Sequence, residues 1–306
     1  MQVPSLGQKL WRKLPLILIL LSVAVGIALF IARTPRPVSA LYVAEIRVTG
    51  ALDYSSTALL GATVGVEEYI RLIRQARDDP MAGAVILVFD SPGGTVAASY
   101  DLFEAVRELS ERKTVVAYAR NLMTSGAYLA ALPAKRIYAS PASLVGSVGV
   151  YTTVLVAEQL LGKLGVTVYT IKSGSMKDIG SLYREMSEEE VKVMEGIVDE
   201  YFQLFKEKVV AYRDSVDPEV FTGRPFAPKE AVAVGLVDGV ADYEEALRRA
   251  RELAGLPPDA PVVELKPRPL TLLDLLLRGA SSTRSITVPR LLILAMWPPP
   301  EAVVLP

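Results

Sequence analysis

The chain has 306 residues, 22% charged and 51% hydrophobic, a composition typical of a globular protein with an added apolar segment. Its formal net charge is −1, so the charge balance does not indicate a nucleic-acid partner. The absence of cysteine and histidine excludes disulfides, a thiol nucleophile, the usual zinc ligands and a Ser-His-Asp triad within this chain. Hydrolytic chemistry would therefore need a lysine or carboxylate base, or a carboxylate-only metal site.

The first element in chain order is an uncharged apolar run at residues 14–32. At about 1.5 Å per residue it nearly spans a bilayer core of about 30 Å, and slightly more basic residues precede it than follow it. The alternative is a cleaved signal peptide, because Val38-Ser39-Ala40 resembles a small-residue cleavage site. The run is long for a signal peptide, so we favour an uncleaved anchor with a cytoplasmic N-terminus.

Strand and helix patterns then alternate along the chain. Residues 41–49 alternate apolar and polar, and residues 82–90 form the continuous apolar run typical of a strand buried on both faces. Ser187 and Glu190 are spaced as a helix capping box. We expect strands at 41–49, 82–90, 114–120, 136–140 and 166–173, and helices at 66–78, 96–112, 124–132, 156–165, 187–213, from about 228, and at 242–255.

Repeated strand-helix units predict an α/β domain with a mostly parallel sheet, in which ligands bind at the carboxyl ends of the strands. We divide the chain into an anchor and linker at 1–40, the α/β domain at 41–255 and a proline-rich tail at 256–306. The tail holds two apolar runs, 271–277 and 291–297, each too short to span a membrane. These runs could pack on the domain, cover an apolar groove or contact the bilayer surface.

Acyl transfer without histidine needs a hydroxyl nucleophile, a base and donors for the developing oxyanion. Ser125 lies at the start of a predicted helix, where the N–H of Gly126 could bind an oxyanion. Gly94, in a glycine pair after a predicted strand, could supply a second donor, because glycine lets the backbone approach a substrate closely. The alternatives are a helix cap for Ser125 and a tight turn for the glycine pair.

The candidate bases are Lys172 and Lys177, which flank Ser173-Gly174-Ser175. Lysine acts as a base only when neutral, so it must be shielded from water and must lack a carboxylate partner. Asp178 adjoins Lys177 and would therefore have to point away from it. Ser147 could orient the lysine through a hydrogen bond.

An acidic run, Glu188-Glu189-Glu190, opens one of the predicted helices. We interpret it as the exposed first turn of that helix and not as a metal site.

Four motifs together resemble signal peptide peptidase A, the SppA family of membrane-bound serine peptidases. They are DSPGGTV at 90–96, TSGAYLAA at 124–131, SLVGSVGV at 143–150 and IKSGSMKDI at 171–179, and they occur in the family's order. The resemblance runs from about residue 42 to 250 and is to the short, one-repeat form of the family. One departure is Thr124-Ser125-Gly126-Ala127, where the family usually has Ala-Ser-Gly-Gly.

The resemblance implies the ClpP/crotonase fold and a Ser-Lys dyad. Matched by motif, the nucleophile is Ser125, the base Lys177, the lysine-orienting residue Ser147 and the oxyanion glycine Gly94. It implies no metal, nucleotide or other cofactor. It also implies homo-oligomers, in which a dyad can be completed by a neighbouring subunit.

The implied activity is hydrolysis of apolar peptides, such as remnant signal peptides, by an enzyme held in the cell membrane by one N-terminal helix. The implied location of the catalytic domain is extracytoplasmic. Three alternatives stay open. They are a stomatin-associated peptidase of the same fold, a crotonase-like acyl-CoA enzyme that would not need Ser125, and a non-catalytic membrane scaffold.

Overall fold

A computed structural model describes residues 22, 25, 41–54, 64–267 and 293–296 of the chain. The predicted membrane anchor at 14–32 lies outside these residues except for Ser22 and Val25, as do the possible cleavage site and the apolar run at 271–277. No helix within the described residues is long and apolar enough to cross a membrane. The described residues from 41 onwards belong to one compact unit.

The core of this unit is an eight-stranded sheet in the order β10-β1-β2-β4-β5-β9, with β6 paired to β4 and β8 paired to β6. Every strand pair in it is parallel except β6 with β8, which confirms the predicted α/β class with a mostly parallel sheet. The strands are β1 (Tyr42–Thr49), β2 (Ala82–Ser91), β4 (Thr114–Thr124), β5 (Arg136–Ala139), β6 (Leu144–Gly146), β8 (Pro225–Phe226), β9 (Gly239–Val240) and β10 (Val262–Glu264).

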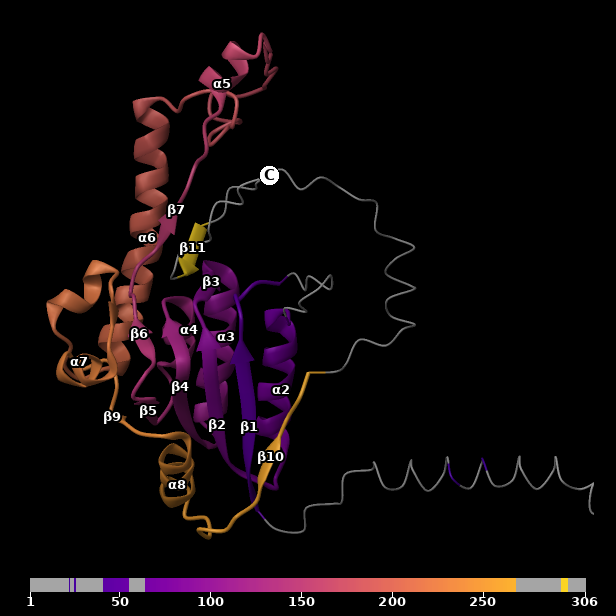
Figure 1. The fold of residues 1–306 in the computed structure, drawn as a ribbon, viewed down its shortest axis with the longest axis vertical. Helices are drawn as coiled ribbons and strands as arrows, with labels where there is room; N and C mark the ends of the chain where they lie inside the picture. The colour runs from indigo at the N-terminus through magenta and orange to yellow at the C-terminus, as the bar shows by residue number, and fades with distance from the viewer. Residues whose placement is uncertain (1–21, 23–24, 26–40, 55–63, 268–292, 297–306) are drawn as a thin grey trace, which may run out of the picture. The chain divides into compact units, whose positions relative to one another are not determined.

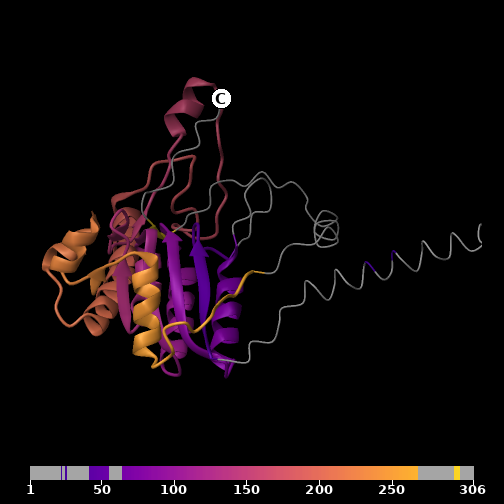
Figure 2. The ribbon, with the colours of Figure 1, turned by 60° about the horizontal axis from the view of Figure 1, so that its bottom comes forward.

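Helices cover both faces of the sheet, with α8 on one side and α2 and α3 on the other (Figures 1 and 2). In β2, Ala84, Ile86 and Val88 pack with Ala246 and Leu247 of α8, and the residues between them are also fully buried. The apolar run of β2 is therefore buried on both faces, as its sequence predicts. The helices are α2 (Val66–Asp78), α3 (Val96–Ser110), α4 (Gly126–Ala131), α5 (Glu158–Lys163), α6 (Glu188–Tyr212), a 3-10 helix η1 (Pro218–Thr222), α7 (Pro228–Ala233) and α8 (Tyr243–Leu253).

A second, antiparallel sheet of three short strands lies beside the first. It has the order β3-β11-β7, with β3 at Gly93–Thr95, β7 at Tyr151–Thr152 and β11 at Ile293–Met296. Strand β11 belongs to the tail run at 291–297, so of the three expectations for this run the structure favours packing on the domain. The large sheet also continues past residue 255, because β10 pairs with β1.

The segment 153–187, which we call the arm, joins β7 to α6 and projects away from the large sheet (Figure 1). The predicted strand at 166–173 is wrong, because this part of the arm has no neighbouring strand and its side chains face solvent. Tyr169 and Ile171 are 87% and 99% exposed. The prediction of an exposed Glu190 is also wrong, whereas the capping box of Ser187 and Glu190 is confirmed.

Candidate active site

Two of the predicted site serines lie side by side at the carboxyl end of the large sheet. Ser125 directly follows β4, Ser147 directly follows β6, and the last residues of these parallel strands, Thr124 and Gly146, are register partners. The backbone N–H of Ser125 donates a hydrogen bond of 2.6 Å to the carbonyl of Gly146. The parallel pairing of β4 and β6 therefore brings the two serines together where α/β sheets bind ligands.

Both serines have a strained backbone. Among the described residues, Ser125 and Ser147 are the two non-glycine residues with a positive φ, and each has a φ of 53°. Both are buried, with 1% and 5% exposure. Such a conformation costs about 1–3 kcal/mol and persists mainly where function requires it. The strain marks these two positions as candidates for catalysis independently of any motif.

The side chain of Ser125 does not cap its helix. Ser125 occupies the position before α4, but its hydroxyl makes no capping hydrogen bond. It donates instead to the carbonyl of Gly149, over 3.3 Å. The alternative of a simple helix cap therefore loses its physical basis, because a capping serine accepts from the backbone of its own helix.

Ser147 is held by the segment that follows η1. Its hydroxyl donates to the carbonyl of Gly223 at 2.8 Å, and its backbone N–H donates to the carbonyl of Arg224 at 3.0 Å. Its hydroxyl makes no contact with Lys177 in the described part of one chain, so the lysine-orienting role stays a prediction.

Lys177 lies on the arm and is exposed. Among the described residues of one chain, its ammonium group has no hydrogen-bond or ion-pair partner, Ser125 included. The neighbouring Asp178 instead binds Lys172 at 2.5 Å and Arg184 at 2.7 Å, which hold the pKa of Asp178 well below its usual range. A base lysine must lack a carboxylate partner, and Lys177 meets this condition whereas Lys172 does not.

Gly94 lies where no larger residue fits. A Cβ at this position would approach the backbone oxygen of Leu52 to 1.9 Å. The carbonyl of Gly93 and the N–H of Thr95 both hydrogen bond to Leu52. Because neighbouring residues of a strand direct their backbone groups to opposite edges, the N–H of Gly94 points to the other edge, towards β11. Gly94 can therefore donate to a strand bound at that edge.

Gly126, the second predicted donor, is buried at the first position of α4. The N–H groups of a first helical turn have no partner within the helix. Helix α4 also contacts both β3, which contains Gly94, and β11. These placements agree with the predicted oxyanion site, although both donor roles stay predictions.

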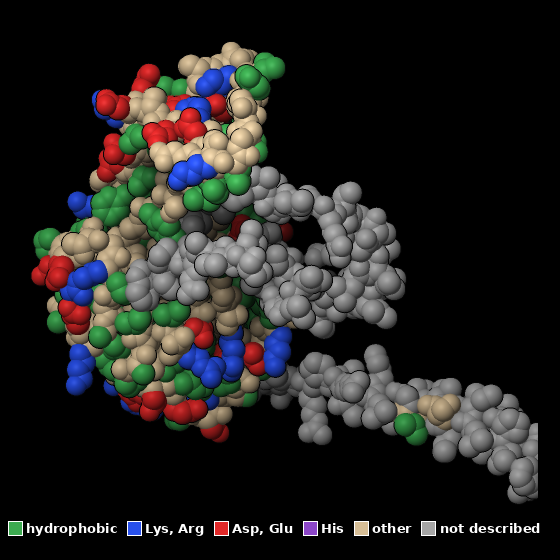
Figure 3. All heavy atoms as spheres, turned by 45° about the horizontal axis from the view of Figure 1, so that its top comes forward, with side chains coloured by type: hydrophobic (Ala, Val, Ile, Leu, Met, Phe, Trp, Pro, Cys, Tyr) green, Lys and Arg blue, Asp and Glu red, His purple; other side chains and the backbone are tan. Residues whose placement is uncertain are grey.

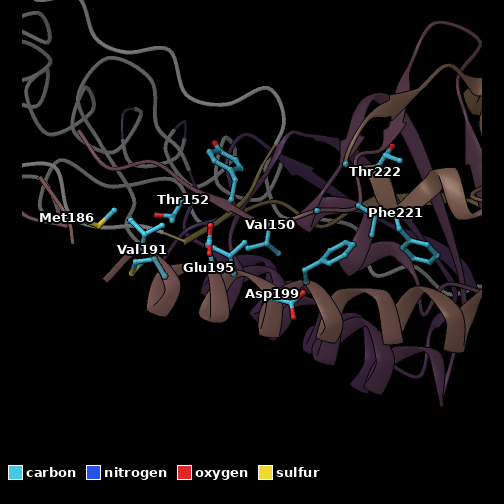
Figure 4. Close-up of a pocket in the computed structure, with 15 residues that line it drawn as sticks. Val150, Thr152, Met186, Val191, Glu195, Asp199, Phe221 and Thr222 are labelled. Atoms are coloured by element: carbon cyan, nitrogen blue, oxygen red, sulfur yellow. The ribbon is translucent and has the colours of Figure 1, made fainter. Parts of the chain in front are cut away.

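An apolar cleft of about 540 Å³ opens beside the two serines. One wall is the segment 148–152, the opposite wall is α6, and Phe221–Gly223 closes one end (Figure 4). Gly149 and Gly223, which accept the hydrogen bonds from Ser125 and Ser147, both belong to its walls. Its apolar contacts come mainly from Val148, Val150, Val191, Met194, Val198 and Phe202.

No group of three or more Asp and Glu residues able to hold a metal ion occurs in the described residues. Sequence reasoning did not predict the paired charges of Arg184 or the pairing of β11 with β3. The sequence signal for the charge pairs was Arg184 itself, a basic residue close to the Lys177 motif. The signal for the pairing of β11 was the apolar run at 291–297.

The mostly parallel sheet and the strained serine at its carboxyl end define an α/β protein with a candidate nucleophile, and comparison with known proteins shows its family. Residues 107–257 match the sequence profile of Peptidase family S49. A Synechocystis protein assigned as a protease is 36% identical over 236 residues, which cover 74% of this chain and 80% of that protein. The chain belongs to peptidase family S49.

Two further relatives support this membership. A protein of Methanocaldococcus jannaschii assigned as a protease is 38% identical over 61% of this chain and 61% of its own length. The chloroplastic serine protease SPPA of Arabidopsis thaliana is 33% identical over 78% of this chain. The matched part of this chain spans only 35% of the Arabidopsis protein.

Among solved structures, the membrane-bound stomatin-specific protease 1510-N aligns at 18% identity with a TM-score of 0.46. The alignment covers 76% of this chain and all of that chain (100%).

The strain at Ser125 gives a first prediction. Ser125→Gly should be about 1 kcal/mol more stable than Ser125→Ala, because glycine adopts a positive φ without steric cost. Chemical denaturation of both variants measures this difference. At Ser99, inside helix α3, the order of stability should reverse, since glycine is unfavourable in a helix interior. Equal stabilities at position 125 would contradict the strained backbone.

The contact between Gly94 and Leu52 gives a second prediction. Gly94→Ala should lower the free energy of unfolding by at least about 2 kcal/mol, because its Cβ would overlap the backbone of Leu52. Gly196→Ala is the matched control, since no atom lies within 4 Å of its added Cβ and it lies in helix α6. Thermal unfolding of both variants provides the comparison, and a Gly94→Ala protein as stable as the parent would refute the close approach.

Proposed function

We propose that Ser125 is the nucleophile and Lys177 the general base of an endopeptidase. The observation that carries the proposal is the buried, strained Ser125, held beside Ser147 at the carboxyl end of the sheet. Neutral Lys177 takes the proton of the Ser125 hydroxyl as its oxygen attacks the peptide carbonyl. The N–H groups of Gly94 and Gly126 stabilise the oxyanion. Protonated Lys177 then donates this proton to the peptide nitrogen, the C–N bond breaks and the amine product leaves. Water attacks the acyl group on Ser125, gives a proton to Lys177, and the carboxylic acid is released as Lys177 returns the proton to the Ser125 oxygen.

Membership of a peptidase family supports this proposal over the acyl-CoA enzyme and the scaffold. A scaffold would also have no use for a buried serine whose strained backbone is not compensated by a helix cap.

A neighbouring copy of the chain supplies Lys177 in this proposal. A lysine base must be shielded from water, and Lys177 is exposed within one chain, so the base needs a second surface to cover it. The arm also exposes large apolar side chains that are expected to be buried against a partner, with Leu164 67% exposed and Ile171 99% exposed. A homo-oligomer in which the arm of one subunit reaches the Ser125 of the next would bury these side chains and complete the dyad.

The substrate is an extended apolar peptide in our proposal. Its binding position is suggested by β11, whose backbone pairs antiparallel with both β3 and β7 and places Ala295 opposite Gly94. Addition of a strand to an exposed edge satisfies the peptide backbone and leaves alternate side chains to adjacent pockets. The apolar cleft beside Gly149 suits hydrophobic side chains of such a peptide.

We assign the enzyme to the cell membrane, anchored by residues 14–32, with its catalytic domain on the extracytoplasmic side. The uncharged run and its basic flanks support the anchor. Apolar peptides left in or near the membrane, such as remnant signal peptides, are then the substrates within reach.

Shared active sites give a prediction for mixed oligomers. Ser125→Ala and Lys177→Ala should each abolish cleavage of an apolar peptide. Lys172→Ala leaves the proposed base Lys177 in place and should still cleave the peptide. Co-assembled from equal amounts of the two inactive variants, the oligomer should recover about a quarter of the parental activity, since one site in four combines an intact serine with an intact lysine. A peptidase assay on the mixture measures this recovery. If the mixture stays inactive while the parent is active, the dyad lies within one chain.

The pairing of β11 gives a further prediction. Deletion of residues 268–306 should lower KM for an apolar peptide, because the strand 293–296 occupies the edge of β3 that the substrate needs. A chain of the same length in which Ala295 is replaced by proline is the control, since proline cannot donate a hydrogen bond to a neighbouring strand. Both changes should lower KM, and an unchanged KM in both would place the substrate elsewhere.

A further inference from the structure

The loop that carries Lys177, residues 172–178, is held by charged side chains and not by apolar packing. We call it the Lys177 loop. No side chain between residues 153 and 189 is buried, although all of these residues are described. A catalytic group must be held close to its productive position, so some other interaction has to fix this loop. Figure 3 shows acidic and basic side chains gathered on the arm.

We infer that Arg184 is a positioning residue that fixes the Lys177 loop to the first turn of α6. This inference rests on the proposed role of Lys177 as the base. Arg184 binds the carboxylate next to Lys177 with one edge of its guanidinium and a carboxylate of α6 with another, and so links the loop to a rigid helix.

The contacts of Arg184 are bidentate on both sides. Its Nε and Nη2 donate to Asp178 at 2.9 and 2.7 Å, and its Nη1 and Nη2 donate to Glu190 at 2.7 and 2.5 Å. The two carboxylates are well shielded, with side-chain exposures of 12% for Asp178 and 5% for Glu190. Arginine forms such planar double contacts and lysine cannot, which makes the geometry specific to this residue type.

A second cation, Lys172, also holds this loop. Lys172 donates to Asp178 at 2.5 Å and to the backbone carbonyl of Ser175 at 2.6 Å. Asp178 therefore binds two cations, and Lys177 lies in the sequence between Ser175 and Asp178, which both contact Lys172. The side chain of Lys177 has no partner among the described residues, and so it can reach a serine outside this loop.

The helix end of the linkage is itself rigid. Glu190 forms the capping box with Ser187, with hydrogen bonds of 2.9 and 3.2 Å. Farther along α6, Phe205 and Val209 are buried, and the ring of Tyr212 packs edge-on against Phe103 of α3 at 5.5 Å. The position of Lys177 is thereby tied to the core through Asp178, Arg184 and α6.

Both carboxylates stay ionised at any working pH. Arg184 first and Lys172 second hold the pKa of Asp178 well below its usual range, and Arg184 with the N–H of Ser187 lowers the pKa of Glu190 to about 2. A carboxylate with a depressed pKa contributes its stabilisation above its unfolded pKa and loses it as pH falls through the folded pKa. The linkage is therefore intact at neutral pH, where it would act.

The test compares Arg184→Ala with Arg248→Ala in the full-length protein. Arg248 also pairs with two carboxylates, but on α8, away from the arm. We expect Arg184→Ala to lower kcat at least about tenfold with KM within about twofold, because the loss affects the base and not substrate binding. Millimolar guanidinium should partly restore kcat in Arg184→Ala, and Asp178→Asn should reproduce its loss. Arg248→Ala should keep parental kcat.

Several outcomes would overturn the inference. One is parental kcat in Arg184→Ala while Lys177→Ala is inactive, which leaves the proposed function intact. Another is a loss of the oligomer in Arg184→Ala that guanidinium does not reverse, since the residue would then be structural. An active Lys177→Ala would instead refute the proposed function itself, whatever the result for Arg184.

Discussion

The parallel pairing of β4 with β6 determines where chemistry can occur in this molecule. It ends at Thr124 and Gly146, and the short hydrogen bond from Ser125 to Gly146 holds the chain in its strained turn at that point. Both serines with a positive φ directly follow these two paired strands. A shift of β6 by one residue would move Ser147 out of line with Ser125, and the adjacent cleft would lose the walls that include Gly149 and Gly223.

The proposed base belongs to a different kind of structure. Ser125 is set by a buried sheet, whereas Lys177 is carried on an exposed arm that is organised by ion pairs. In the described part of one chain the two side chains do not meet. In the mechanism that we propose, assembly of several copies brings Ser125 of one chain together with Lys177 of another, and an isolated chain carries little activity.

Much of the fold could be predicted from the sequence, because buried strands and amphipathic helices carry strong patterns. The apolar run of β2, the helix at 66–78 and the capping box at Ser187 are confirmed. The strand predicted at 166–173 is wrong, since the apolar residues of this exposed segment alternate in the sequence like those of a buried strand. Strands of two or three residues, such as β7, are too short to carry a pattern, and no local signal revealed the positive φ of Ser125 or the burial of Glu190.

The most direct test of the account is covalent labelling of the full-length oligomer with a serine-directed phosphonate, followed by mass spectrometry of its peptides. The account predicts one labelled residue, Ser125, and labelling that becomes much slower in Lys177→Ala. Labelling of a different serine, or labelling of Ser125 at the same rate without Lys177, would contradict it.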